Sequence, residues 1–343
     1  MKHLLVINPH CFKRPGSLDK IIAEINNSFS VICQKNTDDY KIHISRYSRD
    51  AIPAVHRYIS AFPKDEVVRV YAVGGDGTLF DCLNGMVDFP NAELTSVPYG
   101  NNNDFILAFG ENKNGEISKR FRDFKELSAS PSRPVDIINC GSNYAMLEVN
   151  IGIIGQTLIY KNDIFSKIPE KILRKNISFA YKLCALLVFF KKAIFKQRYT
   201  IFLDGEDLSG TYYHIKAANN ACNAGSFTPN PCAMPDNGSF EVVLGSTTSR
   251  LKIFGSIRNY NKGRSGKPKF YTLRRGKKLE VKSDELMSVM IDDEAFYTDN
   301  IQLELIPGGI KFFAPEGLDF VDYSHFDYKG LEKIKENGKN ENV

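Results

Sequence analysis

The sequence predicts an α/β domain followed by a β-rich domain, and two observations lead to this fold class. Strand and helix patterns alternate up to about residue 125, which is typical of a parallel sheet covered by helices. After residue 134, short apolar segments follow one another with Gly, Asn and Asp between them, as in an antiparallel sandwich. We therefore expect a three-layer α/β domain at 1–129, a β-sandwich with inserted helices at 130–328, and a flexible tail at 329–343.

Four segments of the first domain have the β-branched and aromatic composition of buried strands, at 4–7, 41–45, 67–73 and 94–97. Apolar residues at helical spacing follow Ser17, Asp50 and Thr78, and the side chains of Ser17 and Asp50 are suited to cap the helices that they precede. Ligands bind at the carboxyl ends of parallel strands. The loops that follow these strands are therefore the candidate binding loops.

Cysteine usage and apolar run lengths exclude several classes of protein. The seven cysteines are scattered and form no CxxC pair, so we expect neither a disulfide framework nor a zinc site. The apolar start of the chain is too short for a signal peptide, and the longest apolar run, at 183–190, is too short to span a bilayer. We therefore expect a reduced, cytoplasmic protein.

Basic residues are concentrated in the second half, although the net charge is only +5. Residues 161–198 contain ten Lys or Arg against two acids, and residues 250–282 contain twelve against one. Large apolar residues interleave with the basic ones at 161–198, which suits an anionic membrane surface. An amphipathic helix packed on the β domain is the alternative. No nucleic-acid-binding signature accompanies the charge, so nucleic acid is not expected as a partner.

The most informative loop is Gly74-Gly75-Asp76-Gly77-Thr78, which we call the glycine loop. Glycines let bare backbone N–H groups approach an anion, and the start of a helix adds further N–H groups and a positive dipole, so the loop indicates a phosphate site. A carboxylate among such amides repels phosphate unless a cation lies between them. Asp76 therefore indicates Mg²⁺ shared with a nucleotide. The alternative is a tight turn in which Asp76 caps the helix.

Three motifs in order resemble the catalytic domain of the diacylglycerol kinase family, which includes bacterial lipid kinases, sphingosine kinases and ceramide kinases. They are Ile7-Asn8-Pro9, the glycine loop with Asn84-Gly85 after it, and Pro98-Tyr99-Gly100-Asn101-Asn102-Asn103-Asp104-Phe105. Residues 231–241 and Asp292-Asp293-Glu294 are similar to motifs of the family's second domain. The resemblance, which covers most of residues 1–325, implies an ATP-binding domain of the NAD kinase and phosphofructokinase type, a lipid-binding β domain, and an active site between them.

The resemblance also implies roles for individual residues. Asp76 would be catalytic and lie near the phosphates and Mg²⁺. Glu294 would accept the proton of the substrate hydroxyl, and Asp292, two residues away and so on the same strand face, would orient it or bind metal. A structural metal site of the family corresponds to Asp236 and Asn237, where we expect weak or no binding because Asn carries no charge. The implied nucleotide contacts are Asn8, Pro9, His10, Gly74, Gly75, Asp76, Gly77, Thr78, Asn101, Asn103 and Asp104.

Four departures from the family's pattern leave the activity open. Phe80-Asp81 stands in place of Asn-Glu, Asn101-Asn102 in place of Thr-Gly, Asn237 in place of Asp, and Asp293 in place of Gly. Asn101 keeps a polar side chain for a phosphate contact, and Asn102 tolerates a left-handed backbone better than most residues.

The first hypothesis is an ATP- and Mg²⁺-dependent lipid kinase that acts on diacylglycerol or a similar lipid alcohol at the inner face of the membrane. A soluble kinase related to NAD kinase, which shares the Gly-Gly-Asp-Gly-Thr motif, is one alternative, and a lipid-binding member without activity is the other. The identity of the lipid, occupancy of the structural metal site and the oligomeric state, including a homodimer, stay open.

Overall fold

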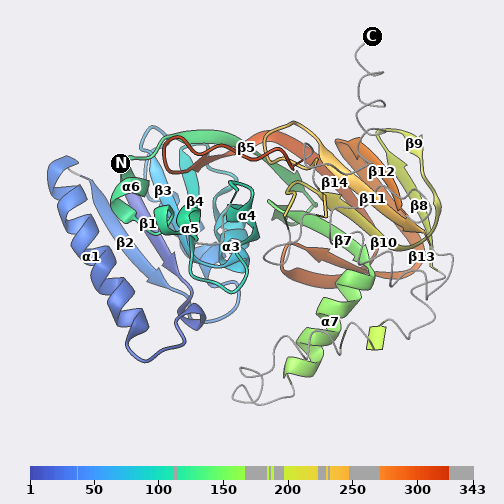
Figure 1. The fold of residues 1–343 in the computed structure, drawn as a ribbon, viewed down its shortest axis with the longest axis horizontal. Helices are drawn as coiled ribbons and strands as arrows, with labels where there is room; N and C mark the ends of the chain where they lie inside the picture. Colours follow the sequence, from blue (N-terminus) through green and yellow to red (C-terminus); the bar gives the residue numbers. More distant parts are fainter. Residues whose placement is uncertain are drawn as a thin grey trace, which may run out of the picture.

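Figure 1 shows two halves side by side, an α/β half that contains the N-terminus and a half made mainly of strands. This is the fold class that the sequence predicts. Within the described residues, no helix combines the length and the apolar character needed to cross a membrane. The structure, a computed structural model, describes residues 1–36, 38–110, 115–166, 184, 187–188, 197–222, 229–230, 232–246 and 271–323.

The first half contains a parallel sheet in the order β2-β1-β3-β4, flanked by helices. Every residue of β3 and β4 is buried, as expected for parallel strands with both faces covered. The strands are β1 (Lys2–Ile7), β2 (Asp39–Ile44), β3 (Val68–Gly74) and β4 (Ala92–Pro98), and the helices are η1 (Pro9–Cys11), α1 (Ser17–Asn36), α2 (Ala51–Ile59), α3 (Asp76–Met86), α4 (Asp104–Leu107), α5 (Glu116–Arg120) and α6 (Phe124–Ala129).

The second half is antiparallel, with the order β12-β11-β10-β7-β13-β14 and with β8 paired to both β10 and β13. One helix, α7 (Ile153–Ser166), is described here. The strands are β5 (Ser132–Asn139), β6 (Tyr144–Ala145), β7 (Glu148–Gly152), β8 (Arg198–Leu203), β9 (Glu206–Asp207), β10 (Gly210–Ala218), β11 (Phe240–Ser246), β12 (Tyr271–Gly276), β13 (Lys278–Ile291) and β14 (Glu294–Phe313).

Strand β14 joins the two halves, as Figure 1 shows along its upper edge. Its first part pairs with β13, and its last residues pair with β5 and, in parallel, with β4. The register shifts between Ile306 and Ile310, where Gly308 has φ +59°, and this irregularity lets one strand serve both halves. One sheet path therefore runs from β12 to β2. The division of the chain at residue 129 stays a prediction.

Each half has its own hydrophobic core, and each core takes residues from the other half. Phe312 and Phe313 of β14 belong to the core of the α/β half, where Phe312 packs against Phe105 with ring centroids 4.8 Å apart. In the other direction, Phe80 of α3 is 2% exposed and lies in the core of the β half. This departure from the family's pattern is therefore a packing residue that fastens α3 to the β half.

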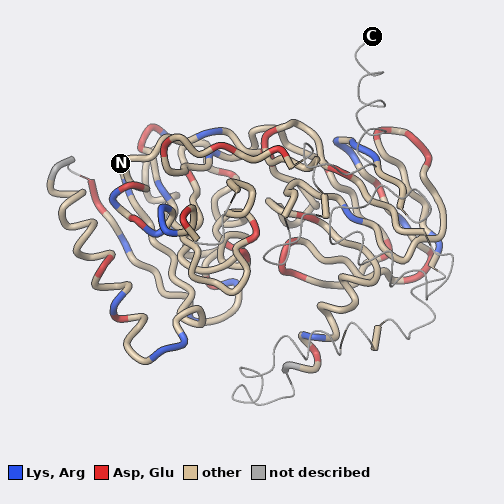
Figure 2. Tube along the Cα trace, viewed as in Figure 1, with Lys and Arg blue, Asp and Glu red and all other residues tan. Residues whose placement is uncertain are grey.

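Figure 2 shows both signs of charge on both halves of the described chain. Most of the two basic stretches that suggested a membrane surface, residues 167–183 and 189–196 of the first and 250–270 of the second, lies outside the described residues. Of the helices expected to be inserted in the β domain, the described residues of this region contain α7, which spans Ile153–Ser166. The membrane interpretation stays a prediction.

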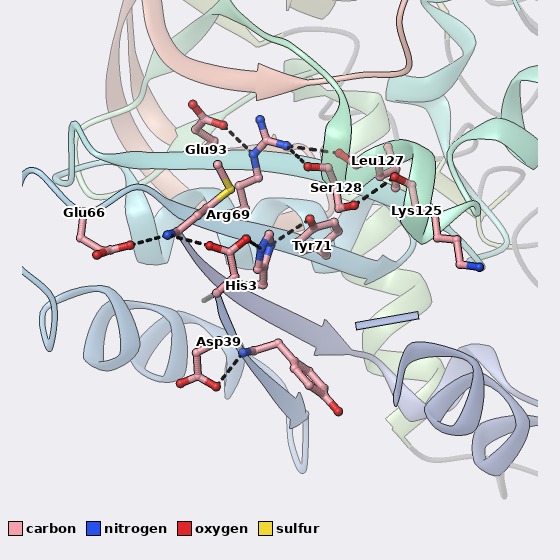
Figure 3. A network of polar contacts seen from close by, with 12 residues as sticks. His3, Asp39, Glu66, Arg69, Tyr71, Glu93, Lys125, Leu127 and Ser128 are labelled. Carbon is pink, nitrogen blue, oxygen red and sulfur yellow. Dashed lines mark hydrogen bonds and ion pairs between the residues drawn. The ribbon is translucent and has the colours of Figure 1, made fainter. Parts of the chain in front are cut away.

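A buried ion pair holds the amino-terminal edge of the parallel sheet, opposite the glycine loop (Figure 3). Arg69 Nε donates to Glu93 Oε2 at 2.9 Å, and both side chains are buried. The same guanidinium donates to the backbone carbonyls of Ser128 and Ser130 at 2.9 and 2.8 Å, at the end of α6. This network lies at the opposite end of the sheet from the glycine loop, so we assign it a role in stability rather than in catalysis.

Candidate active site

The glycine loop lies against the loop that follows β4, at the carboxyl edge of the parallel sheet. The carbonyl of Gly74 accepts the N–H of Gly100 at 2.8 Å. A Cβ on Gly100 would stand 2.3 Å from Cα of Gly75, and a Cβ on Gly74 would stand 2.2 Å from the hydroxyl oxygen of Thr78. These glycines are therefore required because two loops and the start of α3 pack closely here.

Asp76 is held by the loop after β4. Its Oδ2 accepts the N–H of Asp104 at 2.7 Å and its Oδ1 accepts that of Phe105 at 3.4 Å, so the carboxylate caps α4 rather than α3, where it lies. Burial and the neighbouring carboxylates of Asp104 and Asp293 raise the pKa of Asp76 well above its usual range, although the Asp104 N–H opposes this rise. The capping alternative is thus realised on a different helix, and a role of Asp76 toward Mg²⁺ stays a prediction.

The other implied nucleotide contacts of the first half lie on the loops around the same edge. Asn8 accepts the N–H of His10 at 3.1 Å and caps η1, whose first residue is Pro9. Asn103 donates to the carbonyl of Gly100 at 2.9 Å. The structure therefore brings these residues together with the glycine loop, although their contact with ATP stays a prediction.

A cavity of about 360 Å³ lies beside the first loop. The Lys13 ammonium, which lines it, donates to Asn101 Oδ1 at 3.0 Å and so connects the cavity to the loop after β4. The sequence analysis gives Lys13 no role, because nothing in the sequence links it to a residue 88 positions away. The lining mixes aromatic, aliphatic, basic and small polar side chains with one carboxylate, from Cys11, Phe12, Lys13, Arg14, Ser17, Lys20, Ile21, Glu24 and Tyr99.

The acidic motif of the second half lies at the tip of the β13–β14 hairpin. Ile291 pairs with Glu294, so Asp292 and Asp293 form the two-residue turn, and Asp292 has φ +47°. The expectation that Asp292 and Glu294 share one face of a strand is therefore wrong, because the chain reverses between them. Asp292 is 4% exposed, whereas the Glu294 side chain is 41% exposed.

Asp292 anchors this turn to the start of β7. Its carboxylate accepts the successive N–H groups of Met146, Leu147 and Glu148 at 2.9, 3.0 and 2.9 Å, and its own N–H donates to the carbonyl of Glu148 at 2.9 Å. Burial raises the pKa of Asp292 to about 7, and the three N–H donors oppose that rise. Asp292 therefore holds the tip of the hairpin, which carries Glu294, against the start of β7, and a role of Asp292 in orienting Glu294 for catalysis stays a prediction.

The stability difference between the wild type and Asp292→Asn is expected to depend on pH. The pKa of Asp292, about 7 when folded, lies above the value of about 4 in an unfolded chain, so the folded state binds this proton more tightly. Its contribution is complete below about pH 4 and is lost as the pH rises to about 7. Urea unfolding from pH 4 to pH 8 should show a flatter profile for the variant. Parallel profiles would contradict the assignment.

Arg49 links the hairpin to α3. Its Nη2 lies 3.1 Å from Glu294 Oε2, its Nη1 lies 3.2 Å from Asp81 Oδ1, and its guanidinium lies 4.5 Å from the centre of the Phe80 ring. Phe80 and Asp81 are the first departure from the family's pattern. Here they join the two halves, Phe80 by packing and Asp81 through Arg49. The sequence analysis did not single out Arg49.

The turn at Asp236 and Asn237 is closed by the protein's own hydrogen bonds. Asn237 Oδ1 accepts the N–H of Ser239 at 3.1 Å, and the Asp136 carboxylate accepts the N–H of Gly238 at 2.7 Å. Burial and the charge of Asp136 raise the pKa of Asp236. Over the described ranges, no group of three or more His, Cys, Asp or Glu side chains is placed to hold a metal ion. The expectation of weak or no metal binding at this turn stays a prediction.

The groups at the glycine loop fit Mg²⁺ only together with phosphate. The charges of Asp104 and Asp293 raise the pKa of Asp76, and a nearby cation would offset this repulsion. These carboxylates are not, within the part of the chain that the structure describes, a set that holds a metal by itself. Oxygens from nucleotide phosphates would complete the coordination, as is usual for Mg²⁺.

Both halves match family models. Residues 3–140 match the diacylglycerol kinase catalytic domain, and residues 167–314 match the YegS C-terminal NAD kinase beta sandwich-like domain. A protein of Shewanella frigidimarina described as "Probable lipid kinase YegS-like" is 26% identical over 266 residues, which cover 76% of this chain and 80% of that one. A protein of Alcanivorax borkumensis with the same description is 22% identical over 270 residues, covering 76% and 83%.

The fold is also found among solved structures. The crystal structure of a diacylglycerol kinase from Bacillus anthracis superposes with a TM-score of 0.65 at 18% sequence identity, covering 93% of this chain and 98% of that one. At this identity, the likeness establishes the shared fold.

Proposed function

We propose that this chain, which belongs to the diacylglycerol kinase catalytic-domain family, transfers the γ-phosphate of ATP to the hydroxyl of diacylglycerol or a similar lipid. Relatives that are similar in sequence are described as probable lipid kinases. The observation that carries this proposal is the meeting of the glycine loop with the β13–β14 turn. The Asp293 Oδ2 atom lies 3.3 Å from where a Cβ on Gly77 would stand. Acidic groups of one half therefore lie at the phosphate loop of the other, as phosphoryl transfer to an alcohol needs.

The first half would bind the nucleotide. The cavity beside the first loop is large enough for part of a nucleotide, and its apolar wall, with Phe12 and Tyr99, suits a base. Phosphates would extend from there past Lys13 and Asn101 to the glycine loop at the start of α3, where the helix dipole favours an anion. Mg²⁺, when bound near Asp76, would neutralise charge on the phosphates.

The second half would supply the proton acceptor. Glu294 is half exposed at the hairpin tip, and Arg49 and the anchored Asp292 hold it there. A hydroxyl gives up its proton late in phosphoryl transfer, so a carboxylate of ordinary basicity suffices as the base. The basic stretches at 161–198 and 250–282 would bring this half to an anionic membrane surface.

Lys13→Met is expected to raise KM for ATP about tenfold with little change in kcat. The ammonium would contact phosphate equally in the ground state and the transition state, so its loss weakens binding without slowing transfer. Steady-state kinetics at saturating lipid measures both constants. Lys64→Met, which removes an exposed lysine away from the cavity, should leave both unchanged. An unchanged KM in Lys13→Met would argue against this path for the phosphates.

A labelled-phosphate assay tests the proposed function. The protein is incubated with γ-labelled ATP, Mg²⁺ and anionic vesicles that contain diacylglycerol, monoacylglycerol, sphingosine, ceramide or a prenol, and with NAD in a separate reaction. The proposal predicts one labelled lipid, identified by mass. Label on NAD would favour the soluble NAD-kinase alternative, and ATP binding without transfer to any acceptor would favour a lipid-binding protein without activity.

A further inference from the structure

Asp293 occupies a position where the resembled family has glycine, and the backbone does not require glycine there. Among the described residues, the non-glycine positions with positive φ are Arg49, Asp204 and Asp292. The left-handed residue of this turn is therefore Asp292, one position before Asp293. A side chain at 293 is therefore accommodated without strain. The chemical character of the Asp293 side chain, rather than the backbone geometry of the turn, therefore has to explain why an aspartate stands at this position.

The Asp293 carboxylate lies over the second residue of α3. Its Oδ2 stands 3.3 Å, and its Cβ 3.9 Å, from where a Cβ on Gly77 would be. The start of a helix of 11 residues presents N–H groups that attract anions. The hairpin thus places a negative charge of the protein at the same helix start that would receive a nucleotide phosphate.

The surroundings of Asp293 are crowded yet reached by solvent. The residue is exposed, but desolvation by the surrounding protein is the main influence on its pKa and raises it. Lys161 of α7 lowers this pKa, Glu148 and Glu294 raise it, and a hydrogen bond from the Gly77 backbone lowers it. An incoming phosphate would therefore meet several carboxylates and one nearby ammonium.

We propose, on the basis of the proposed function, that Asp293 is a specificity-determining residue that restricts the glycine loop to metal-bound nucleotide. Its carboxylate lies against the helix start that a phosphate would use and repels free ATP. A divalent cation between carboxylate and phosphate reverses the sign of this interaction.

Calorimetric titration with ATP, in excess EDTA and in excess MgCl₂ at equal ionic strength, tests the proposal without activity. Asp293→Asn keeps the shape and removes the charge, so we expect it to bind ATP in EDTA about tenfold more tightly than the wild type. In MgCl₂ the Asp293→Asn variant should bind ATP no more tightly than the wild type, because the cation between carboxylate and phosphate makes the wild-type interaction attractive. Asp293→Gly should behave like Asp293→Asn, and Asp293→Glu, which keeps the charge, should retain the wild-type dependence on Mg²⁺.

Asp299→Asn is the matched control, because it removes one exposed carboxylate from the same strand, β14. The proposal is overturned if Asp293→Asn and Asp293→Gly bind ATP in EDTA no better than the wild type, or if Asp299→Asn gives the same gain. If the wild type binds no ATP even with MgCl₂, the proposed function itself fails and this inference fails with it. The two failures are distinguished by the wild-type titration alone.

Discussion

Glu294→Gln is expected to lower kcat for lipid phosphorylation by about 10²–10⁴-fold while the affinity for ATP stays unchanged. The variant keeps the size of the side chain and one acceptor oxygen, but an amide cannot take the proton of the substrate hydroxyl, and the loss of a positioned general base has effects of this size. Measuring kcat at saturating ATP and lipid, together with the dissociation constant of ATP, separates chemistry from binding.

The matched control for this result is Glu285→Gln, which changes an exposed glutamate on β13, the other strand of the hairpin. It should leave kcat within the error of the assay. A Glu294→Gln enzyme with wild-type kcat would assign the proton acceptor to another group. A variant that also loses ATP affinity would instead indicate that Glu294 acts through the nucleotide site.

Arg69→Met is expected to lower the free energy of unfolding by about 3–5 kcal/mol, because it leaves the Glu93 carboxylate buried without its cationic partner. The carbonyls of Ser128 and Ser130 lose their donor as well. Urea unfolding followed by fluorescence or circular dichroism measures this change. The network lies at the opposite edge of the sheet from the glycine loop, so the folded variant should keep the ATP affinity of the wild type.

Two further variants make this stability prediction specific. Arg57→Met removes an exposed arginine of α2 and should change the free energy of unfolding by less than about 0.5 kcal/mol. The double variant Arg69→Met/Glu93→Leu replaces both partners by apolar groups and should recover much of the loss. A double variant as unstable as Arg69→Met would mean that the contacts to α6, and not the unpaired carboxylate, account for the effect.

The parts of the structure that depend on local pattern could be predicted from the sequence. The strand before the glycine loop is apolar apart from Arg69, and three glycines in four positions mark where it ends, so the order of strand, loop and helix was predictable. The loops around Asn8 and Asn101 follow β1 and β4, the two strands that flank β3, and parallel pairing brings their carboxyl ends to one edge. The alternation of apolar residues likewise predicts the antiparallel second half.

Contacts between distant segments could not be predicted in this way. The sequence analysis placed Asp50 as a cap of α2, but its side chain makes no capping hydrogen bond and instead accepts the N–H of Arg46 and lies 3.1 Å from His43 Nε2. A local propensity cannot show which of several polar partners a carboxylate will meet. The same limit applies to Arg49 and Glu294, which are brought together only when both halves are folded.

The short apolar segments of the second half do not show the lengths of its strands, because polar residues lie inside long strands. Residues 279–282 and 287–291 are parts of the single strand β13, and residues 301–306 and 310–313 are parts of β14. Asp284 and Glu285 are exposed within β13 and resemble a turn in the sequence. Conversely, the apolar segment at residues 144–152 contains two strands, β6 and β7. The chain between them, at Met146 and Leu147, donates to Asp292 instead.

A crystal structure of the protein with Mg²⁺ and a non-hydrolysable ATP analogue tests most directly whether the two halves form one phosphoryl-transfer site. The account predicts the terminal phosphate at the start of α3, next to Gly77, with the metal ion between it and the carboxylates of the β13–β14 turn. A nucleotide bound elsewhere, with the glycine loop still occupied by the Asp293 side chain, would contradict it.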